Sequence, residues 1–459
     1  MSRANDSLAG ADARGVSFPV TSRPVIDALD VTRAVVISQF LFAAGHLLTT
    51  GGFLYYFANA LKPTATMFSV LLIVPELCEV VSLWCRPIII RLGSRKRTWL
   101  CFFLLARFAA LAIPLMAFPQ FRFSNTVSFW IIVVALAVSS LCQSISYVAY
   151  LSWLSDIVPR KSFGSFFALR RLATLVIMVS IPYLTSLLRG DWSHWQSSDD
   201  IRWAYVTVFL TGGGLLLLTA IPLMRLPDIP VSWNEQEGRR TRWSRELLHT
   251  IWKNRPLRFV LISSWWLAAA QGLTQTVFYL FQTRYLHLPI GVYFLMAALM
   301  YSMQIPFNWI GGYLSDRIGD RGPLLISLPL VSLAMIFWLL ATPEHPEWLY
   351  GAYAVWGLFG LINICERNLL LRVAPRSDNT IPLALSRGGG GVLAALAGLA
   401  GGALLDSLLT HNADAPHVAY RSLFVVSFIL RVTAPLWLLK VTPRPQSPSY
   451  HSAQKSMPA

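Results

Sequence analysis

The most constraining feature of this sequence is a series of long apolar stretches that recurs along almost the whole chain. A helix that crosses the hydrocarbon core of a bilayer needs about 20 mostly apolar residues. By that rule the chain contains twelve candidate spans, at residues 33–61, 65–90, 98–118, 126–155, 162–188, 203–224, 257–283, 288–314, 323–341, 347–372, 383–409 and 419–441. The sequence therefore predicts an all-α integral membrane protein with twelve transmembrane helices.

The composition excludes an ordinary water-soluble fold. Of the 459 residues, 55% are hydrophobic and only 13% are charged, and the mean hydropathy is +0.54. A soluble domain carries about 25% charged residues, and one soluble core of this size does not cover so much apolar surface. The five cysteines lie inside apolar stretches without metal-ligand spacing, so we expect free thiols and no metal site.

One polar interval divides the twelve stretches into two sets of six. The predicted organisation is an N-terminal tail over residues 1–31, a six-helix bundle over 32–224, a linker over 225–256, a second six-helix bundle over 257–441 and a C-terminal tail over 442–459. The stretch 243–254 inside the linker is consistent with a short amphipathic surface helix or with a solvated basic segment.

Lysine and arginine are distributed unevenly between two sets of connections. The turns at 62–64, 119–125 and 342–346 carry almost none, whereas both tails, the linker and the turns between the other spans carry most of them. Cytoplasmic loops keep the positive charge, so we expect both termini and the linker to lie on the cytoplasmic side of an inner or plasma membrane. Basic loops that meet anionic lipids, at about 1 kcal/mol per residue, account for the net charge of +16 without a nucleic-acid partner.

A short pattern recurs at corresponding places in the two halves. Residues 159–160 read Pro-Arg and residues 168–171 read Ala-Leu-Arg-Arg; residues 375–376 again read Pro-Arg and residues 384–387 read Ala-Leu-Ser-Arg. The spacing is the same, and each copy falls at the turn after the fourth span of its half. Two six-helix halves related by an axis along the membrane normal are an arrangement of known transporters.

The turn after the eighth span carries a family resemblance. Residues 312–319, GYLSDRIG, resemble the G-x-L-x-D-R-x-G signature of the major facilitator superfamily, and residues 152–159, SWLSDIVP, resemble the end of the fourth helix in many bacterial members. Helix count, linker and repeat agree with that family over residues 33–441. The first-half copy, residues 86–93, departs from the signature, with Arg86 at its glycine position and Ile90 at its aspartate position.

The resemblance implies a secondary transporter that works by alternating access, with the first, fourth, seventh and tenth helices around a central cavity. Six polar residues on these helices are candidates for the cavity wall: His46, Gln143, Tyr147, Gln271, Gln275 and Asn363. Amides and a phenol suit a polar neutral or zwitterionic solute. The alternative is that they form hydrogen bonds between helices, each worth about 0.6 kcal/mol.

Ionisable residues inside spans are candidates for coupling or gating, because they are costly in a membrane. They are Glu76, Glu79, Arg107, Glu366 and Arg387. Glu79 and Arg107 each lie about 14–16 Å from the linker-side ends of adjacent helices, which predicts an ion pair that is either structural or part of a proton relay. Arg387 is the expected partner of Glu366.

The family signature also implies a lock at the cytoplasmic side. We expect Asp316 to lie against the start of the fifth helix, near Ser162, where the helix dipole favours a carboxylate. Four residues form this predicted lock: Asp156, Asp316, Arg317 and Arg372. In the eleventh span, glycines at 388–391, 398, 401 and 402 predict close helix packing. Arg431 has no predicted partner.

The predicted function is secondary transport of a small solute, by symport or antiport, with coupling to protons as one option. The alternative is a receptor or scaffold that kept the fold and lost transport, which the degraded first-half signature favours. No catalytic constellation or nucleotide-binding loop is present in the sequence, so neither an enzyme nor a cofactor is expected. We expect a monomer surrounded by lipids, some of them anionic; substrate, direction and coupling ion stay open.

Overall fold

The computed structural model describes residues 28–121, 123–157, 163–187, 199–228, 252–374 and 380–441. Helices make up the regular structure of these segments, as the apolar stretches predict. Most of the 243–254 stretch lies outside them, so its predicted surface helix is not described.

The first half contains six helical rods, several of which consist of consecutive helices. They are α1 (Ala28–Thr49) with α2 (Gly52–Ala60), α3 (Ala65–Cys78) with η1 (Glu79–Trp84) and α4 (Cys85–Leu92), α5 (Arg95–Ala110) with α6 (Ala112–Ala117), α7 (Asn125–Ile157), α8 (Phe163–Leu187), and α9 (Asp199–Leu218) with α10 (Ala220–Met224). Each rod falls on one of the predicted spans.

The second half repeats this plan. Its rods are α13 (Arg255–Leu280) with the π-helical turn η4 (Phe281–Tyr285), α14 (Ile290–Ile318), α15 (Arg321–Ser332) with α16 (Ala334–Leu340), α17 (Trp348–Trp356) with α18 (Phe359–Val373), α19 (Thr380–His411), and α20 (Pro416–Thr433) with η5 (Ala434–Lys440). Within the described segments, nine of the twelve rods are long and apolar enough to cross a membrane by length and hydropathy alone. The other three contain α3, α8 and α13, which carry polar residues that face the other half.

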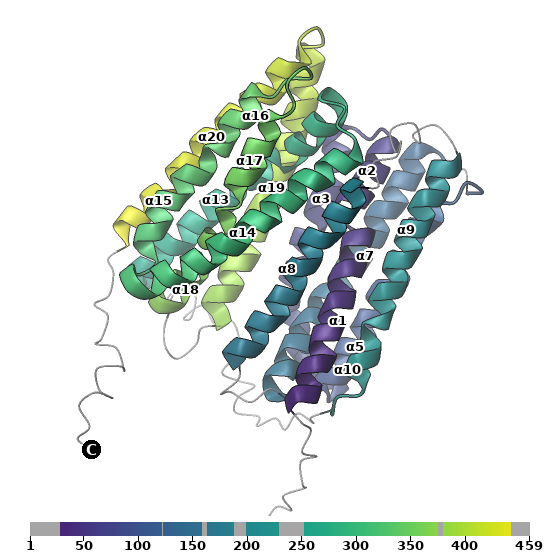
Figure 1. Ribbon diagram of the computed structural model, residues 1–459, viewed down its shortest axis with the longest axis vertical. Coiled ribbons are helices and arrows are strands. Elements are labelled where there is room, and N and C mark those ends of the chain that lie inside the picture. The colour runs from purple at the N-terminus through teal and green to yellow at the C-terminus, as the bar shows by residue number, and fades with distance from the viewer. Residues whose placement is uncertain are drawn as a thin grey trace, which may run out of the picture.

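The two halves lie side by side, with α14 against α8 and α19 against α3 (Figure 1). We call the end where α2, η4 and the start of α14 meet the closed end. The opposite end, where α10 ends and α13 begins, is the linker end. In Figure 1 the two bundles lie closest toward the closed end, at the top, and diverge toward the linker end.

The hydrophobic core follows the same division. At the closed end one cluster of buried side chains runs through both halves and includes Phe53 and Phe209 from the first half and Phe281 and Phe294 from the second. At the linker end the core splits into two clusters, one in each half. Burial of apolar side chains therefore joins the halves at the closed end only.

Glycines allow α19 to pack between α13 of its own half and α3 of the other. A Cβ atom on Gly401 would overlap the carbonyl oxygen of Leu273, and one on Gly402 would overlap the hydroxyl of Ser69. Gly272 of α13 approaches the backbone of Ala394 equally closely. The predicted use of small residues for close helix packing is confirmed.

The first rod of each half is interrupted near the closed end, in two different ways. In the first half the break between α1 and α2 is at Gly51, whose φ of 63° is strained for residues with a side chain. In the second half the helix instead widens into the π-helical turn Phe281–Tyr285. Such turns are rare and often mark functional sites.

Candidate functional site

The closed end is held by a carboxylate from one half on a helix start of the other. Asp406 of α19 accepts hydrogen bonds from the backbone N–H groups of Ala65 and Thr66, each at 2.8 Å, and from the Thr66 hydroxyl at 2.6 Å. These groups form the first turn of α3, where unpaired N–H groups and the helix dipole favour an anion. Sequence reasoning missed Asp406, because a carboxylate near a helix end is usually solvated.

An arginine of the second half also binds the first half at the closed end, and its charge is opposite to that of Asp406. Arg284 of the π-helical turn donates from Nε to the side-chain oxygen of Asn59 at 2.9 Å and from Nη2 to the carbonyl of Pro63 at 2.6 Å. It therefore sits at the C-terminal end of α2, where the helix dipole favours a cation. Tyr56 adds a hydrogen bond from its hydroxyl to the carbonyl of Leu288.

Aromatic rings from both halves also pack against one another at the closed end. The rings of Tyr55 and Tyr279 lie 4.8 Å apart, edge to face, and Tyr279 also contacts Tyr293 at 5.4 Å. Below them, the buried hydroxyls of Ser69 and Thr276 share a hydrogen bond of 2.7 Å across the halves. The closed end is thus sealed by one continuous layer of side chains from both halves.

Midway along the helices, an ion pair links the halves. Arg387 Nη2 of α19 lies 3.7 Å from Glu79 Oε1 of η1, with both side chains partly exposed. The predicted pairs Glu79–Arg107 and Glu366–Arg387 are therefore wrong. Glu76 lies one turn away against Gly391, which lacks the side chain that would crowd it.

Arg107 is buried inside the first half instead. Its Nη2 donates a hydrogen bond to Oε1 of Gln143, and its guanidinium lies over the rings of Phe103 at 4.9 Å and Phe42 at 5.8 Å. The ring of His46 stacks on the ring of Phe42, with the two ring centroids 5.6 Å apart. Two of the predicted cavity residues, His46 and Gln143, thus lie together beside a buried cation.

A second arginine cluster lies on α8. Arg170 Nε donates to Gln39 Oε1 at 2.7 Å and lies over the rings of Tyr150 at 5.2 Å and Tyr147 at 5.9 Å. Gln39 in turn donates to the Thr174 hydroxyl. Sequence reasoning missed Gln39, although an amide in the first span was the available signal.

The next residue, Arg171, points to the other half. It is exposed and interacts electrostatically with Arg367 of α18, with Tyr301 of α14 and with Tyr147. Two arginines from opposite halves therefore act on the same space between α8 and α18.

The remaining predicted cavity residues lie in the second half. Glu366 is partly buried, lines a pocket with Ser264 inside the second half and precedes Arg367 in the sequence. The side chains of Gln271 and Gln275 are partly exposed and that of Asn363 is exposed; none of the three makes a side-chain hydrogen bond to any described residue.

Around the signature after the eighth span, four polar side chains form a cluster at the linker end: Ser315, Asp320, Asn368 and Arg372. Asp320 Oδ2 forms an ion pair with Arg372 Nε at 2.8 Å, and the Ser315 hydroxyl donates a hydrogen bond to the other carboxylate oxygen. Asn368 donates to Ser315. Burial raises the pKa of the Asp320 carboxyl, while Ser315 and Arg372 oppose that shift.

This polar cluster corrects the predicted lock. Arg372 pairs with Asp320 and not with Asp316, which is exposed, and Arg317 lies over the ring of Tyr313 at 4.6 Å. The side chain of Asp156 and the residues around Ser162 lie outside the described part of the chain. The proposed contact of Asp316 with the start of α8 therefore stays a prediction.

The first half has a matching arrangement at its linker end. Gly93 and Gly319, with φ of 67° and 81°, each end a helix just before the polar residue that starts the next one. That residue is Ser94 in the first half, where its hydroxyl donates to Asp228 at 2.7 Å. The corresponding residue in the second half is Asp320. The pseudo-symmetry of the halves thus extends to single side chains.

Arg431, for which the sequence offered no partner, is buried within the second half. Its Nε donates to the Ser427 hydroxyl at 3.0 Å and its Nη2 to the Thr274 hydroxyl at 3.2 Å. Within the described segments, each half thus carries one buried arginine, Arg107 or Arg431, that is hydrogen-bonded to neutral groups.

Comparison with known proteins agrees with these observations. The sequence model of the Major Facilitator Superfamily matches residues 35–362 and 276–458. No curated protein matches the sequence.

Among solved structures, the chain is similar to a D-xylose–proton symporter, with a TM-score of 0.64 and 13% identity over 91% of this chain and 98% of that one. It is also similar to the inward open conformation of the xylose transporter XylE from E. coli (TM-score 0.63, 11% identity, 93% and 99% covered). A third match is the nucleoside transporter NupG (TM-score 0.58, 14% identity, 91% and 99% covered). At these identities the likeness establishes the fold alone.

Proposed function

The chain belongs to the major facilitator superfamily, and from that premise we propose that it is a secondary transporter that moves a small solute across its membrane by alternating access. The observation that carries this proposal is the hydrophobic core, which joins the halves at the closed end and separates at the linker end. Two rigid halves with one shared seal are what a rocking motion around a central site requires.

We further propose that the linker end faces the cytoplasm, so that the structure is the inward-facing state. The support is the concentration of basic residues at 91–97 and 317–321. A reporter fused after Val441 should read cytoplasmic, and one inserted between Asn412 and Ala413 should read external. The opposite pattern would invert the assignment while leaving the transport proposal intact.

The solute that best fits the central space carries an acidic group, alone or as part of a zwitterion. Arg171 and Arg367, both exposed, act on this space from opposite halves, and an anionic group between them would relieve the repulsion between their like charges. Glu366 precedes Arg367 in the sequence but lines a pocket between α13, α15 and α18, so its side chain points into the second half. The amides of Gln271, Gln275 and Asn363 remain available for hydrogen bonds.

We assign proton coupling to the ion pair that links the halves. Glu76 and Glu79 lie one turn apart on the helix that faces Arg387, and protonation of Glu79 would remove the ion pair. Loss of that contact weakens the link between α19 and η1, so a proton bound there favours separation of the halves in that region.

Transport in proteoliposomes tests the proposal. A panel of radiolabelled amino acids, organic acids, sugars and nucleosides is offered to the reconstituted protein with and without an inward proton gradient. We expect accumulation of an acid-bearing solute that depends on the gradient, and Glu79→Gln should keep solute exchange while losing the response to the gradient. Uptake of neutral solutes alone would overturn the substrate class.

The scaffold alternative makes a different structural prediction. A transporter must open its closed end, whereas a scaffold has no need to. Spin labels at Thr126 and Glu344, both exposed near the closed end of opposite halves, report that motion without knowledge of the solute. A single distance under all conditions, together with no transport, would favour the receptor or scaffold.

A further inference from the structure

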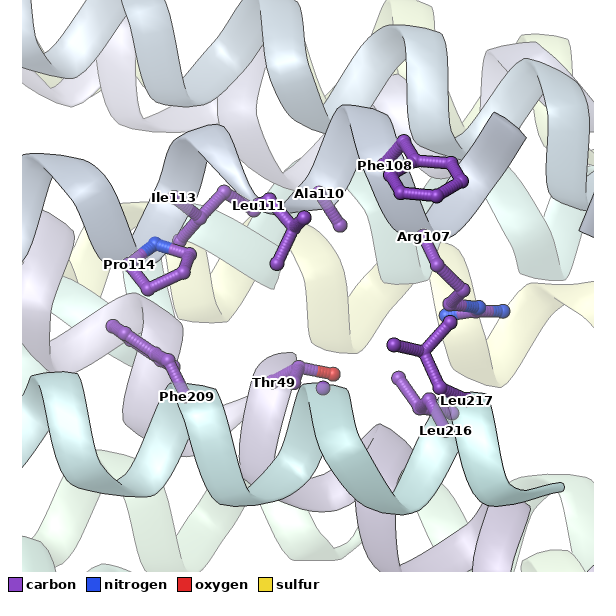
Figure 2. Close-up of a pocket in the computed structure, with 11 residues that line it drawn as sticks. Thr49, Arg107, Phe108, Ala110, Leu111, Ile113, Pro114, Phe209, Leu216 and Leu217 are labelled. Atoms are coloured by element: carbon purple, nitrogen blue, oxygen red, sulfur yellow. The ribbon is translucent and has the colours of Figure 1, made fainter. Parts of the chain in front are cut away.

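A pocket opens on the flank of the first half that faces away from the second half. It lies between α1, the α5–α6 rod and α9. Figure 2 shows Arg107 at one end of this pocket and Ile113 and Pro114 at the other. The lining residues are Thr49, Arg107, Phe108, Ala110, Leu111, Ile113, Pro114, Phe209, Gly213, Leu216 and Leu217.

The mouth of the pocket is apolar and lies on the outer surface of the protein. The side chain of Phe108 is 62% exposed, and Leu111 and Leu217 are exposed beside it. Exposed apolar side chains on a membrane-spanning rod face lipid. The pocket therefore opens to the hydrocarbon of the bilayer and not to the space between the halves.

Arg107 is the only charged residue in the pocket lining, and its charge is incompletely matched. The residue is 8% exposed, and its Nε–H has no hydrogen-bond partner. Its one hydrogen bond goes to the neutral amide of Gln143, and no carboxylate of the described chain forms an ion pair with it. A buried guanidinium without an anion is costly in a membrane, so an acceptor at Nε would be stabilising.

We propose that this pocket binds the carboxylate of a single-chain lipophilic acid that enters from the bilayer. The carboxylate accepts from Arg107 and the hydrocarbon chain runs along the apolar groove toward Pro114. This site is separate from the proposed solute path between the halves, so the two proposals stand or fall independently.

The depth of Arg107 selects a carboxylic acid over a phospholipid. Arg107 lies twelve residues after the start of α5, about 18 Å along the helix, which places it near mid-membrane. A phosphodiester headgroup is permanently charged and stays at the interface. A carboxylic acid crosses hydrocarbon in its neutral form and ionises beside the arginine, where a charge-assisted hydrogen bond favours the anion.

A glycine on α9 leaves the pocket open. A Cβ atom on Gly213 would meet nothing within 4 Å, and the same holds for its neighbour Gly214, which does not line the pocket. A methyl group at 213 would therefore enter the groove without displacing protein atoms, and we expect a longer side chain there to fill it. Gly214 offers a matched control with the same chemical change on the same helix.

Fluorescence titration of the full-length protein in lipid nanodiscs tests the site. The probe is dansyl-undecanoic acid, and its methyl ester is the uncharged control. We expect saturable binding of the acid and at least about tenfold weaker binding of the ester, because the charge-assisted bond is lost. Gly213→Leu should weaken binding of the acid by a similar factor, and Gly214→Leu should leave it unchanged.

Substitution of the arginine completes the test. Arg107→Met should reduce binding of the acid to that of the ester, and Arg107→Lys should restore part of it. Equal binding of acid and ester, or unchanged binding in Gly213→Leu, would overturn the proposal. Gly213→Leu retains Arg107, so it decides the question even if Arg107→Met does not fold.

Discussion

The carboxylate of Asp406 accepts three hydrogen bonds at the start of α3, two of them from the N–H and hydroxyl of Thr66 in the opposite half, at 2.8 and 2.6 Å. An equivalent carboxylate on a mobile loop would leave its partner easily. Here both groups belong to long helices of separate bundles, so the bonds exist only while the closed end is shut. Removing them should shift the population of states and not the folding equilibrium.

We predict that Asp406→Asn opens the closed end. Loss of the anion at the helix start costs about 1 kcal/mol, which corresponds to about a fivefold rise in the population with the closed end open. Distance distributions between spin labels at Thr126 and Glu344 should show this rise, with a melting temperature near that of the wild type. Asp414→Asn, which removes an exposed carboxylate in the turn at the same end, is the control. Equal distance distributions in both variants would contradict the role of Asp406 in holding the closed end shut.

The ion pair between Glu79 and Arg387 should tolerate reversal. Glu79→Arg alone places two arginines opposite each other, and Arg387→Glu alone places a third carboxylate beside Glu76. Both side chains are partly exposed, so each single change should cost at most about 1 kcal/mol, and the double exchange should recover most of it. A double-mutant cycle on melting temperature measures the coupling. Recovery in a Glu79→Arg, Arg171→Glu variant instead would show that the effect is not specific to this pair.

The polar cluster around Asp320 predicts a loss of stability that depends on pH when Arg372 is replaced. Burial raises the pKa of the Asp320 carboxyl, and Arg372 holds that shift in check, so Arg372→Met should raise the pKa further. Above that pKa the folded variant contains an unpaired buried carboxylate; below it the group is neutral. A raised folded-state pKa means that stability is retained at low pH and lost as pH rises.

The penalty of Arg372→Met should therefore be about 2 kcal/mol at pH 8 and should shrink toward pH 5. This is less than for a fully buried pair, because the side chain of Arg372 is 42% exposed. Thermal melts of both proteins across this range measure the difference. In an Asp320→Asn background, the cost of Arg372→Met should not change with pH; a slope that persists there would assign the effect to another group.

Two glycines on α19 should respond oppositely to the same substitution. A Cβ atom at Gly401 would overlap the backbone of Leu273, whereas one at Gly388 would meet nothing within 4 Å. Gly401→Ala should destabilise the protein by about 1–3 kcal/mol through overpacking. Gly388→Ala should be neutral or stabilising by up to about 1 kcal/mol, because alanine loses less backbone freedom in a helix. Melting temperatures in one detergent provide the comparison, and equal values would exclude tight packing at Gly401.

The fold was predictable because a bilayer imposes one length scale on every helix. The partner of Glu79 was not predictable, because the depth of a residue along a helix does not say in which direction around the helix its side chain points. Glu79 directly follows the last residue of α3 and still has α-helical backbone angles. Its side chain points from there toward α19 of the other half, where Arg387 lies, and not toward Arg107.

The lock shows a similar limit. Asp316 and Asp320 lie four residues apart, and a continuous helix would place both on one face. Gly319, at φ 81°, ends the helix between them, so Asp320 folds back against Arg372 while Asp316 stays exposed. A family signature locates the turn, but the glycine that breaks the helix decides which carboxylate is buried.

The π-helical turn at the end of the first rod of the second half has a consequence for the contact between the two halves. A π turn accommodates one more residue than an α turn, so side chains within it are turned about the helix axis relative to their α-helical positions. Arg284 lies within this turn and reaches Asn59 of the other half. Deleting a single residue from 281–285 would return the helix to its regular period and turn Arg284 away from Asn59, so a change of one residue is enough to release this contact between the halves.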